Sequence, residues 1–450
     1  MIKLQNLALL PLVLAFALSV GGQATPNIIK GEESRKNGDW DSAINFYSAA
    51  IAADEMNSNP ELIVVAYGHR AQAYFNLQQF YPAIKDATKA IEAKADVTWL
   101  YILRAGCYRR VKKLDEAISD FTQAIQLDPK AVEPYAMRAN AYSDKGQLDL
   151  AISDLTKAIE LKPQDVGSFI LRASDLRRQG LYEDAARDCI EALRLDPKSI
   201  DANIGLGLSL IHQQQFSSAI ASFDRAIALD VSSFDAHFFK AEANRSLGKV
   251  NDAIADYTAA IDLRPDYKGY YVSRAGAYAD IGEFQLAIKD YGRAEQLDPK
   301  DPRIPYLRAC DLLYSGDAPG AQRESDRFLK NSSASKDAAD AIIVGYLARR
   351  KAGDKTDADK FLTESLTSSQ PDSWPRMILQ YFKGELTATG FLGAATDTDK
   401  LTEAHTYIGE MLLLRNEPAE AREHFLWVKS NGSKTFSEYY LALAELKHLT

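Results

Sequence analysis

Small apolar residues recur along this chain at a spacing of 34 positions, in two columns that lie twelve positions apart. The first column is Ala71, Ala105, Ala139, Ala173, Gly207, Ala241, Ala275 and Ala309, and the second is Ala83, Ala117, Ala151, Ala185, Ala219, Ala253, Ala287 and Ala321. In most repeats a large apolar residue stands four positions before the first column or four after the second, on the same helical face. The pattern predicts antiparallel pairs of amphipathic helices, which pack closely where the side chains are short.

Glycine and proline mark the expected helix ends. Glycines lie between the two columns, where a left-handed residue ends the first helix of a pair. They are Gly146, Gly180, Gly248, Gly282 and Gly316. The second helix is followed by Pro129, Pro197, Pro265 or Pro299, and proline cannot continue a helix. Each 34-residue unit is therefore expected to be helix, turn, helix and stop.

This pattern resembles the tetratricopeptide repeat (TPR) family. The likeness is plainest in YILRAGCYRRVKKLDEAISDFTQAIQLDP, from Tyr101 to Pro129, and in YVSRAGAYADIGEFQLAIKDYGRAEQLDP, from Tyr271 to Pro299. It implies an all-α fold, a right-handed superhelical solenoid of antiparallel helix pairs with a degenerate helical C-terminal region. It also implies a concave face lined by the first helix of each pair, and so a protein that binds rather than catalyses.

The repeat register predicts six segments. They are a signal peptide (1–24), a first TPR with an inserted loop (25–63), eight TPR repeats (64–335), a degenerate helix pair (336–371), a non-repeat linker (372–401), and a last TPR-like pair with a capping helix (402–450). The C-terminal part is similar to bacterial envelope TPR adaptor proteins, on the motifs EAHTYIGE (Glu403 to Glu410) and EYYLALAEL (Glu438 to Leu446).

The first 24 residues have the pattern of a secretory signal. A single charge at Lys3 precedes an apolar stretch from Leu7 to Val20, and small residues lead up to Ala24. This apolar run is shorter than the roughly 20 residues that span a bilayer. We therefore expect cleavage after Ala24, no membrane span in the mature chain, and a periplasmic location. No cysteine precedes Cys107, so we expect no lipoprotein anchor.

A cation and a carboxylate recur together in the repeats. The cation precedes the first small column, and the acid follows the second small column by three positions. The pairs are Arg70 and Asp86, Arg104 and Asp120, Arg138 and Asp154, Arg172 and Asp188, Lys240 and Asp256, Arg274 and Asp290, and Arg308 and Glu324. Leu206 and Ser222 replace both members at once, which predicts that the two side chains meet. Repetition at fixed spacing favours a structural role over a ladder of ligand sites.

Charge and motifs narrow the function further. The net charge of −9, without a long basic run, argues against nucleic-acid binding. The chain has no GxSxG, HExxH, phosphate-binding glycine loop or CxxC motif, so we predict neither an enzyme nor a cofactor. A zinc site can be drawn from His405, Glu410, Glu423 and His424, but such side chains are common on exposed helices and we predict no metal. The odd number of cysteines, each in a different repeat, favours buried structural thiols.

The resemblance also places a groove. By analogy with TPR superhelices, the fifth position of each first helix points inward, and here none is cationic, which disfavours a clamp for a terminal carboxylate. The fifth positions are Gly68, Ile102, Ala136, Ile170, Ile204, Phe238, Val272 and Tyr306. Other inward positions form the predicted partner site, Arg109, Arg110, Asn140, Arg177, Arg178 and Arg245. They suit a protein or peptide segment with carboxylates and apolar anchors. The alternative is that the arginines are solvated or pair with neighbouring acids such as Asp144.

The resulting prediction is an exported TPR scaffold or adaptor that binds a protein or peptide on its concave face. The alternative is an oligomeric component of an envelope assembly or secretion machine, since the sequence leaves the oligomeric state open. The repeat over 200–233 departs from its neighbours, with Leu206, Leu208 and Leu210 close together. Local repacking, a softer joint or an interface with another subunit would each account for this.

Overall fold

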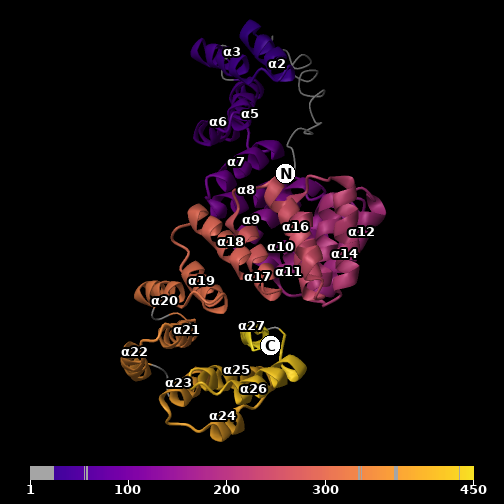
Figure 1. Ribbon diagram of the computed structural model, residues 1–450. Helices are drawn as coiled ribbons and strands as arrows, with labels where there is room; N and C mark the ends of the chain where they lie inside the picture. Colours follow the sequence, from indigo (N-terminus) through magenta and orange to yellow (C-terminus); the bar gives the residue numbers. More distant parts are fainter. Residues whose placement is uncertain are drawn as a thin grey trace. The chain divides into compact units, whose positions relative to one another are not determined.

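The computed structural model describes residues 25–449, apart from 55, 57, 58, 333, 334, 336, 369–372 and 435. The predicted signal peptide (1–24) lies outside the described residues. The chain divides into two compact units, one ending at Gln213 and the other beginning at Gln214. This boundary falls inside the repeat over 200–233. Figure 1 shows that both units are built of helices.

The first unit consists of successive helix pairs. Its elements are α2 (Pro26–Lys36), α3 (Trp40–Ala52), α4 (Pro60–Ile63), the π-helical η2 (Val64–Gly68), α5 (His69–Asn76), α6 (Phe80–Ala93), α7 (Thr98–Arg110), α8 (Leu114–Leu127), α9 (Val132–Asp144), α10 (Leu148–Leu161), α11 (Val166–Arg178), α12 (Tyr182–Leu195) and α13 (Ile200–His212). The helices α2 and α3 pack on each other, α3 packs on η2 and α5, and from α4 to α13 each helix packs on the next. The apolar face of one pair is thus covered by its neighbours.

The second unit continues in the same way and then becomes irregular. Its helices are α14 (Phe216–Leu229), α15 (Phe234–Ser246), α16 (Val250–Leu263), α17 (Lys268–Asp280), α18 (Phe284–Leu297), α19 (Arg303–Tyr314), α20 (Ala318–Ser332), α21 (Ala338–Lys351), α22 (Lys355–Ser368), α23 (Trp374–Lys383), α24 (Ala388–Ala394), α25 (Thr398–Leu413), α26 (Pro418–Asn431) and α27 (Ser437–His448). The described residues contain no strand. The predicted all-α solenoid of helix pairs is confirmed.

The two small-residue columns form the helix crossings. All eight alanines of the second column have no exposed surface, and the seven alanines of the first column are equally buried. An alanine at such a crossing lets two backbones approach closely, and the larger side chains around it then fill the core. Phe121, Phe223 and Tyr257 are among the largest fully buried side chains. The 34-residue spacing of the alanines therefore determines where the helices of each pair cross.

The helix ends also follow the prediction. Gly146, Gly180, Gly248, Gly282 and Gly316 all have positive φ, between 74° and 87°. Where a repeat lacks this glycine, Gln78, Lys112 or Gln214 takes the same left-handed conformation, with φ between 58° and 63°. The turn is thus a property of the repeat, and glycine only makes it less strained. The helices that precede the four prolines end at Leu127, Leu195, Leu263 and Leu297.

The segment over 372–401, predicted as a linker, contains two helices that pack into the core of the second unit. The Trp374 and Tyr381 rings both stack on Phe391, with centroids 5.2 and 5.0 Å away. Phe391 and Leu379 are completely buried. Asp397 caps α25 by accepting from the Lys400 amide at 2.8 Å, so this polar stretch starts a helix.

The C-terminal helix α27 folds back on earlier helices of the second unit. It packs on α25, α26 and α17. The Lys351 ammonium donates to Glu445 of α27 at 2.6 Å and lies 2.9 Å from the buried Glu410 of α25. Leu441 of α27 is 1% exposed. This helix covers the end of the array, as a capping element does.

Candidate partner-binding surface

The inner face of the first unit is made by the first helices of its pairs. The helix α9 contacts both α7 and α11, and α11 contacts α13, although a complete helix intervenes in each case. In a curved array the elements on the inner side lie closest together, so this contact pattern places the first helices on the concave side. The predicted site residues of this unit lie on α7, α9 and α11.

Arg109, at the end of α7, is paired within the chain. Its Nε donates to Asp144 of the next repeat at 2.7 Å, and both side chains are about one third exposed, at 38% and 33%. Arg110 is exposed and lies over the Phe80 ring, 5.3 Å from the centroid. Arg109 therefore follows the alternative interpretation, in which the arginine pairs with a neighbouring acid, here Asp144.

Asn140 and Arg178 also have partners inside the chain. The Asn140 amide donates to the Ala136 carbonyl in its own helix at 3.0 Å. Arg178 donates to the Ser143 hydroxyl at 2.5 Å, the Ser143 carbonyl at 3.1 Å and Asp175 at 3.2 Å. Arg178 is exposed, so it still presents charge to solvent while it joins α9 to α11.

Arg177 is different, because the described residues supply no hydrogen-bond acceptor or ion-pair partner for its guanidinium. It is half-buried, and a Cβ added to Gly205 of α13 would lie 3.3 Å from its Nη1 and 2.9 Å from the Cys189 sulfur. The guanidinium therefore lies next to space that a side chain at position 205 would occupy. Burial lowers the pKa of Arg177, and the opposing effects of Cys189 and Asp175 do not offset it.

Two half-buried aliphatic side chains lie on the same pair of helices as Arg177 and Gly205. Of the inward fifth positions in this unit, Gly68, Ile102 and Ala136 are buried, whereas Ile170 and Ile204 are half-buried. Ile170 stands two helical turns before Arg177 on the same face of α11, and Ile204 adjoins Gly205 on α13. One cation and two half-buried aliphatic side chains therefore lie on the neighbouring helices α11 and α13.

Arg245 belongs to the second unit and is fully engaged there. Its Nε and Nη2 donate to the Asp280 carboxylate at 2.6 and 3.1 Å. Burial opposes the charge, but the hydrogen bond and the charge of Asp280 outweigh it and hold the pKa of Arg245 above its usual range. A cavity of about 510 Å³ lies nearby, lined by residues of α17–α19 and by Tyr440 and Leu443 of α27. The C-terminal helix thus covers part of the surface around Asp280.

The recurring cation and carboxylate meet as the sequence predicts. Arg138 Nε and Nη2 each donate to Asp154 at 2.8 Å, and the hydrogen bond raises the pKa of Arg138. The same two-point contact occurs at Arg70, Arg104, Arg172 and Arg274. Lys240 lies 3.4 Å from Asp256, and Arg308 makes one contact of 2.6 Å with Glu324. At the exception, Leu206 joins an apolar cluster with Ala173 and Leu176.

A third partner of these arginines escaped the sequence analysis. The Nη1 of Arg138 donates to the Thr122 hydroxyl of the preceding repeat at 2.9 Å. Thr88, Thr156 and Thr258 serve Arg104, Arg172 and Arg274 in the same way, and Ser48 serves Arg70. Threonine recurs 16 positions before the arginine, a signal that the sequence does contain. Each arginine therefore joins two consecutive repeats, which supports the structural role.

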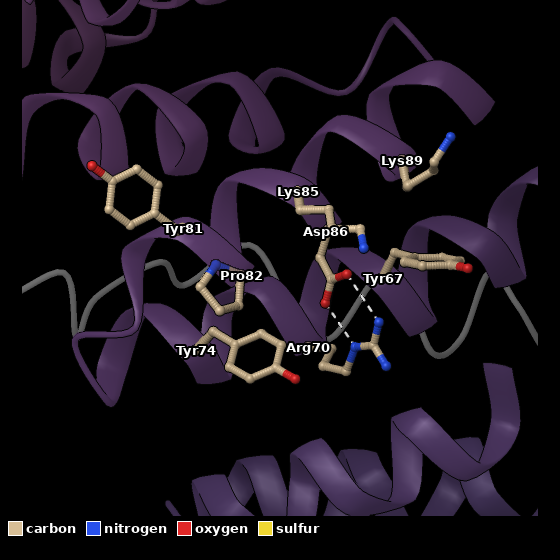
Figure 2. Close-up of a pocket in the computed structure, with 8 residues that line it drawn as sticks. All are labelled: Tyr67, Arg70, Tyr74, Tyr81, Pro82, Lys85, Asp86 and Lys89. Carbon is tan, nitrogen blue, oxygen red and sulfur yellow. Dashed lines mark hydrogen bonds and ion pairs between the residues drawn. The ribbon is translucent and has the colours of Figure 1, made fainter. Parts of the chain in front are cut away.

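Figure 2 shows the first of these pairs within a surface pocket of about 560 Å³. Tyr67 and Tyr74 flank Arg70, whose guanidinium carbon lies 5.4 and 5.9 Å from the two ring centroids. Lys85 and Lys89 line the opposite side. Since Asp86 and Ser48 already accept from Arg70, this arginine has a structural role in the pocket.

A second buried network, at the N-terminal end, was also missed. Glu32 is 4% exposed and accepts from the Tyr47 hydroxyl at 2.5 Å and from Arg35 at 2.9 Å. His69 of α5 forms a further short contact with the same carboxylate. Burial raises the pKa of Glu32, but the charges and hydrogen bonds of His69 and Arg35 outweigh it and hold that pKa well below its usual range.

His405, His424 and the three cysteines are placed as packing groups. The His405 and His424 Nδ1 atoms lie 2.9 Å apart, and the His405 ring stacks on Trp427 with centroids 4.0 Å apart. In the part of the chain that the structure describes, no three His, Cys, Asp or Glu side chains are arranged to share a metal ion. The three cysteines are buried and unlinked, and burial raises the pKa of Cys107 and of Cys189 to about 12.

Fold and surface together define a helical repeat scaffold with a concave face, and comparison with known proteins agrees. Two tetratricopeptide repeat models match, one at residues 64–97, 100–131 and 132–165, the other at 170–233, 205–268 and 240–302. These segments make up more than half of the sequence, and the chain belongs to the tetratricopeptide repeat family. Proteins of this family generally bind other proteins or peptides, and their fold is typically non-catalytic.

Solved structures of other proteins are similar to parts of this chain. A TPR protein from Parabacteroides merdae is 18% identical over 56% of this chain and 98% of its own, with a TM-score of 0.46. YrrB, a TPR protein with an unusual peptide-binding site, is 21% identical over 42% of this chain and 97% of its own, with a TM-score of 0.35. MamA is 26% identical over 36% of this chain and 95% of its own, with a TM-score of 0.34. No curated protein matches the sequence.

Proposed function

We propose that this protein is an exported scaffold that binds a polypeptide partner on the concave face of its first unit. The observation that carries the proposal is the grouping of Arg177 with Ile170 and Ile204 on α11 and α13. A half-buried guanidinium without an anion, with half-buried aliphatic side chains on the same two helices, suits a segment that carries carboxylates and apolar side chains. Arg109 and Arg178, already paired within the chain, contribute to the positive potential of this face.

The proposed location rests on the sequence of the first 24 residues, with its charge at Lys3 and its short apolar run. None of the described helices is both long and apolar enough to cross a membrane. The likeness of the C-terminal motifs to bacterial envelope TPR adaptors supports a periplasmic role as an adaptor.

The first test concerns export. We expect the mature protein to begin at Thr25 and to be released with the soluble periplasmic fraction, because the apolar stretch is too short for a stable membrane anchor. N-terminal sequencing of the exported protein and membrane sedimentation measure this. Recovery of Met1 from sedimented membranes would show instead that the segment is retained as an anchor.

The second test concerns the concave face. We expect Arg177→Glu combined with Arg178→Glu to weaken capture of the partner from envelope extracts and to reduce the salt dependence of capture. The helical melt should shift to lower temperature, because Arg178→Glu loses the contacts with Ser143 and Asp175, so capture is compared at a temperature where both proteins are folded. Reversal of Lys157 and Lys162, which lie on the second-helix side, is the matched control. Undiminished capture by the folded double variant would place the binding surface elsewhere.

A further inference from the structure

In every second repeat from the first to the one that holds Arg245, an arginine stands four residues after the small residue of the first helix. These arginines are Arg35, Arg109, Arg177 and Arg245. In two of these repeats the anion comes from the next repeat, 35 residues further along the chain. Arg109 pairs with Asp144 at 2.7 Å, and Arg245 pairs with Asp280 at 2.6 Å. The contact is therefore a recurring element of this array.

For Arg177, the residue 35 positions further along the chain is His212, not an acid. The His212 ring stacks on Tyr182, with centroids 4.3 Å apart and planes 5° apart, so it supplies no anion. The nearest acid in the helix, Asp175, pairs with Arg178 and accepts from the Ser143 hydroxyl at 2.5 Å. The array thus leaves one arginine of this column without the carboxylate that its counterparts receive.

The surroundings of Arg177 do not compensate for the absence of a carboxylate partner. Its guanidinium lies close to Gly205 and Cys189. The Gly205 carbonyl already accepts from the Ser209 hydroxyl at 2.8 Å, and a thiol is a weak acceptor. A half-buried cation without acceptors is less stable than one that a carboxylate satisfies. Since the side chain is still partly exposed, an acceptor can reach it from the concave side.

We propose that an acidic side chain of the bound polypeptide pairs with Arg177, in the place that Asp144 and Asp280 take against Arg109 and Arg245. This inference rests on the proposed function and specifies its ligand. A carboxylate fits better than a phosphate, because Asp175 lies close by and repels a doubly charged group more strongly. Ile170 and Ile204 call for aliphatic residues next to the acid.

The test introduces a carboxylate partner for Arg177 within the chain itself. His212→Asp places a carboxylate at the register position of Asp144 and Asp280, where it should pair with Arg177 and exclude the ligand. The probe is a fluorescein-labelled peptide in which Leu, Glu and Ser alternate, with an amidated C-terminus. A second peptide has Gln in place of Glu, and both are measured on the full mature chain by fluorescence anisotropy.

We expect the wild type to bind the Glu peptide at least about tenfold more tightly than the Gln peptide, a difference of the size measured for charged hydrogen bonds. His212→Asp should remove this preference and raise the melting temperature, because it satisfies Arg177 internally. His212→Asn, which also loses the ring but adds no charge, should keep the preference. Lys157→Gln should keep it as well, since Lys157 lies on the second helix of its repeat and pairs with Glu160.

Each contrary result has a separate meaning. Equal binding of the two peptides by the wild type, or an unchanged preference in a stabilised His212→Asp variant, overturns the pairing with Arg177. An unchanged or lower melting temperature of His212→Asp relative to His212→Asn shows that Arg177 does not lack an anion, and overturns it too. A third probe, the Gln peptide with a free C-terminus, is measured beside them, and tight binding of this probe alone would overturn the side-chain pairing in favour of a terminal carboxylate. Binding of neither peptide overturns the proposed function itself.

Discussion

Arg138→Ala is expected to lower the free energy of unfolding by about 3 kcal/mol, the size found when one partner of a buried ion pair is removed. Asp154, whose side chain is 10% exposed, would lose both donors and keep its charge. Thr122 of the preceding repeat would lose its contact with Nη1 in the same step. Urea unfolding followed by far-UV circular dichroism measures the change, with attention to the slope, because long repeat arrays depart from two-state behaviour.

A double-mutant cycle separates the pair from the packing of the arginine stem. Asp154→Ala alone should also destabilise the protein, and the double variant should lose less than the sum of the single losses. The exposed pair of Arg109 and Asp144 is the control, with an expected coupling below about 1 kcal/mol. Absence of coupling between Arg138 and Asp154 would contradict the structural role of the recurring pairs.

The recurring pairs show what the sequence is able to predict. Arg138 and Asp154 lie within one repeat, where the helix crossing fixed by Ala139 and Ala151 determines their distance. The joint replacement at Leu206 and Ser222 adds a second, independent sign of contact. Contacts of this kind follow from local geometry that is repeated along the chain, so the fold and its recurring pairs could be predicted together.

Contacts between repeats are harder to predict, because they depend on how closely successive first helices approach. The sequence places Arg109 and Arg177 at equivalent positions, and only the structure distinguishes them, through Asp144 in one case and His212 in the other. The acid lies 35 residues away, a spacing that no single repeat reveals. The predicted site therefore included arginines already paired within the chain, together with the one whose anion is missing.

The network at Glu32 was missed although the sequence contains a sign of it. Glu242 stands at the equivalent place in a later repeat, and accepts from the Tyr257 hydroxyl at 2.5 Å. Both glutamates have an arginine three positions later and a tyrosine fifteen positions later. The pattern occurs in only two repeats, which is too few to stand out against the columns that recur eight times. The Glu32 network is buried because α2 and α3 pack closely. A Cβ added to the neighbouring Gly31 would lie only 2.6 Å from the Tyr47 ring.

Glu32→Gln should destabilise the first repeat by about 3 kcal/mol at neutral pH, because Arg35 and His69 would then face a neutral amide in a buried site. The loss should be local, since an end repeat of a solenoid is able to open without the rest. Native-state hydrogen exchange of the α2 amides measures it. Glu33→Gln, an exposed neighbour on the same helix, is the matched control and should change exchange little.

The effect of this substitution should also depend on pH, in a direction fixed by the pKa of Glu32. The pKa is held below its usual range in the folded protein and returns to about 4.3 when the chain unfolds. The carboxylate therefore contributes its full stability above about pH 4.3, and the contribution disappears as the pH falls toward the folded pKa. Arg35, Tyr47 and His69 are the groups that face it. Protection of α2 in the wild type should fall between about pH 4.5 and pH 3, so that the difference from Glu32→Gln becomes smaller over this range. A difference between the two proteins that stays constant over this range would show that packing, and not the charge of Glu32, holds α2 against α3 and α5.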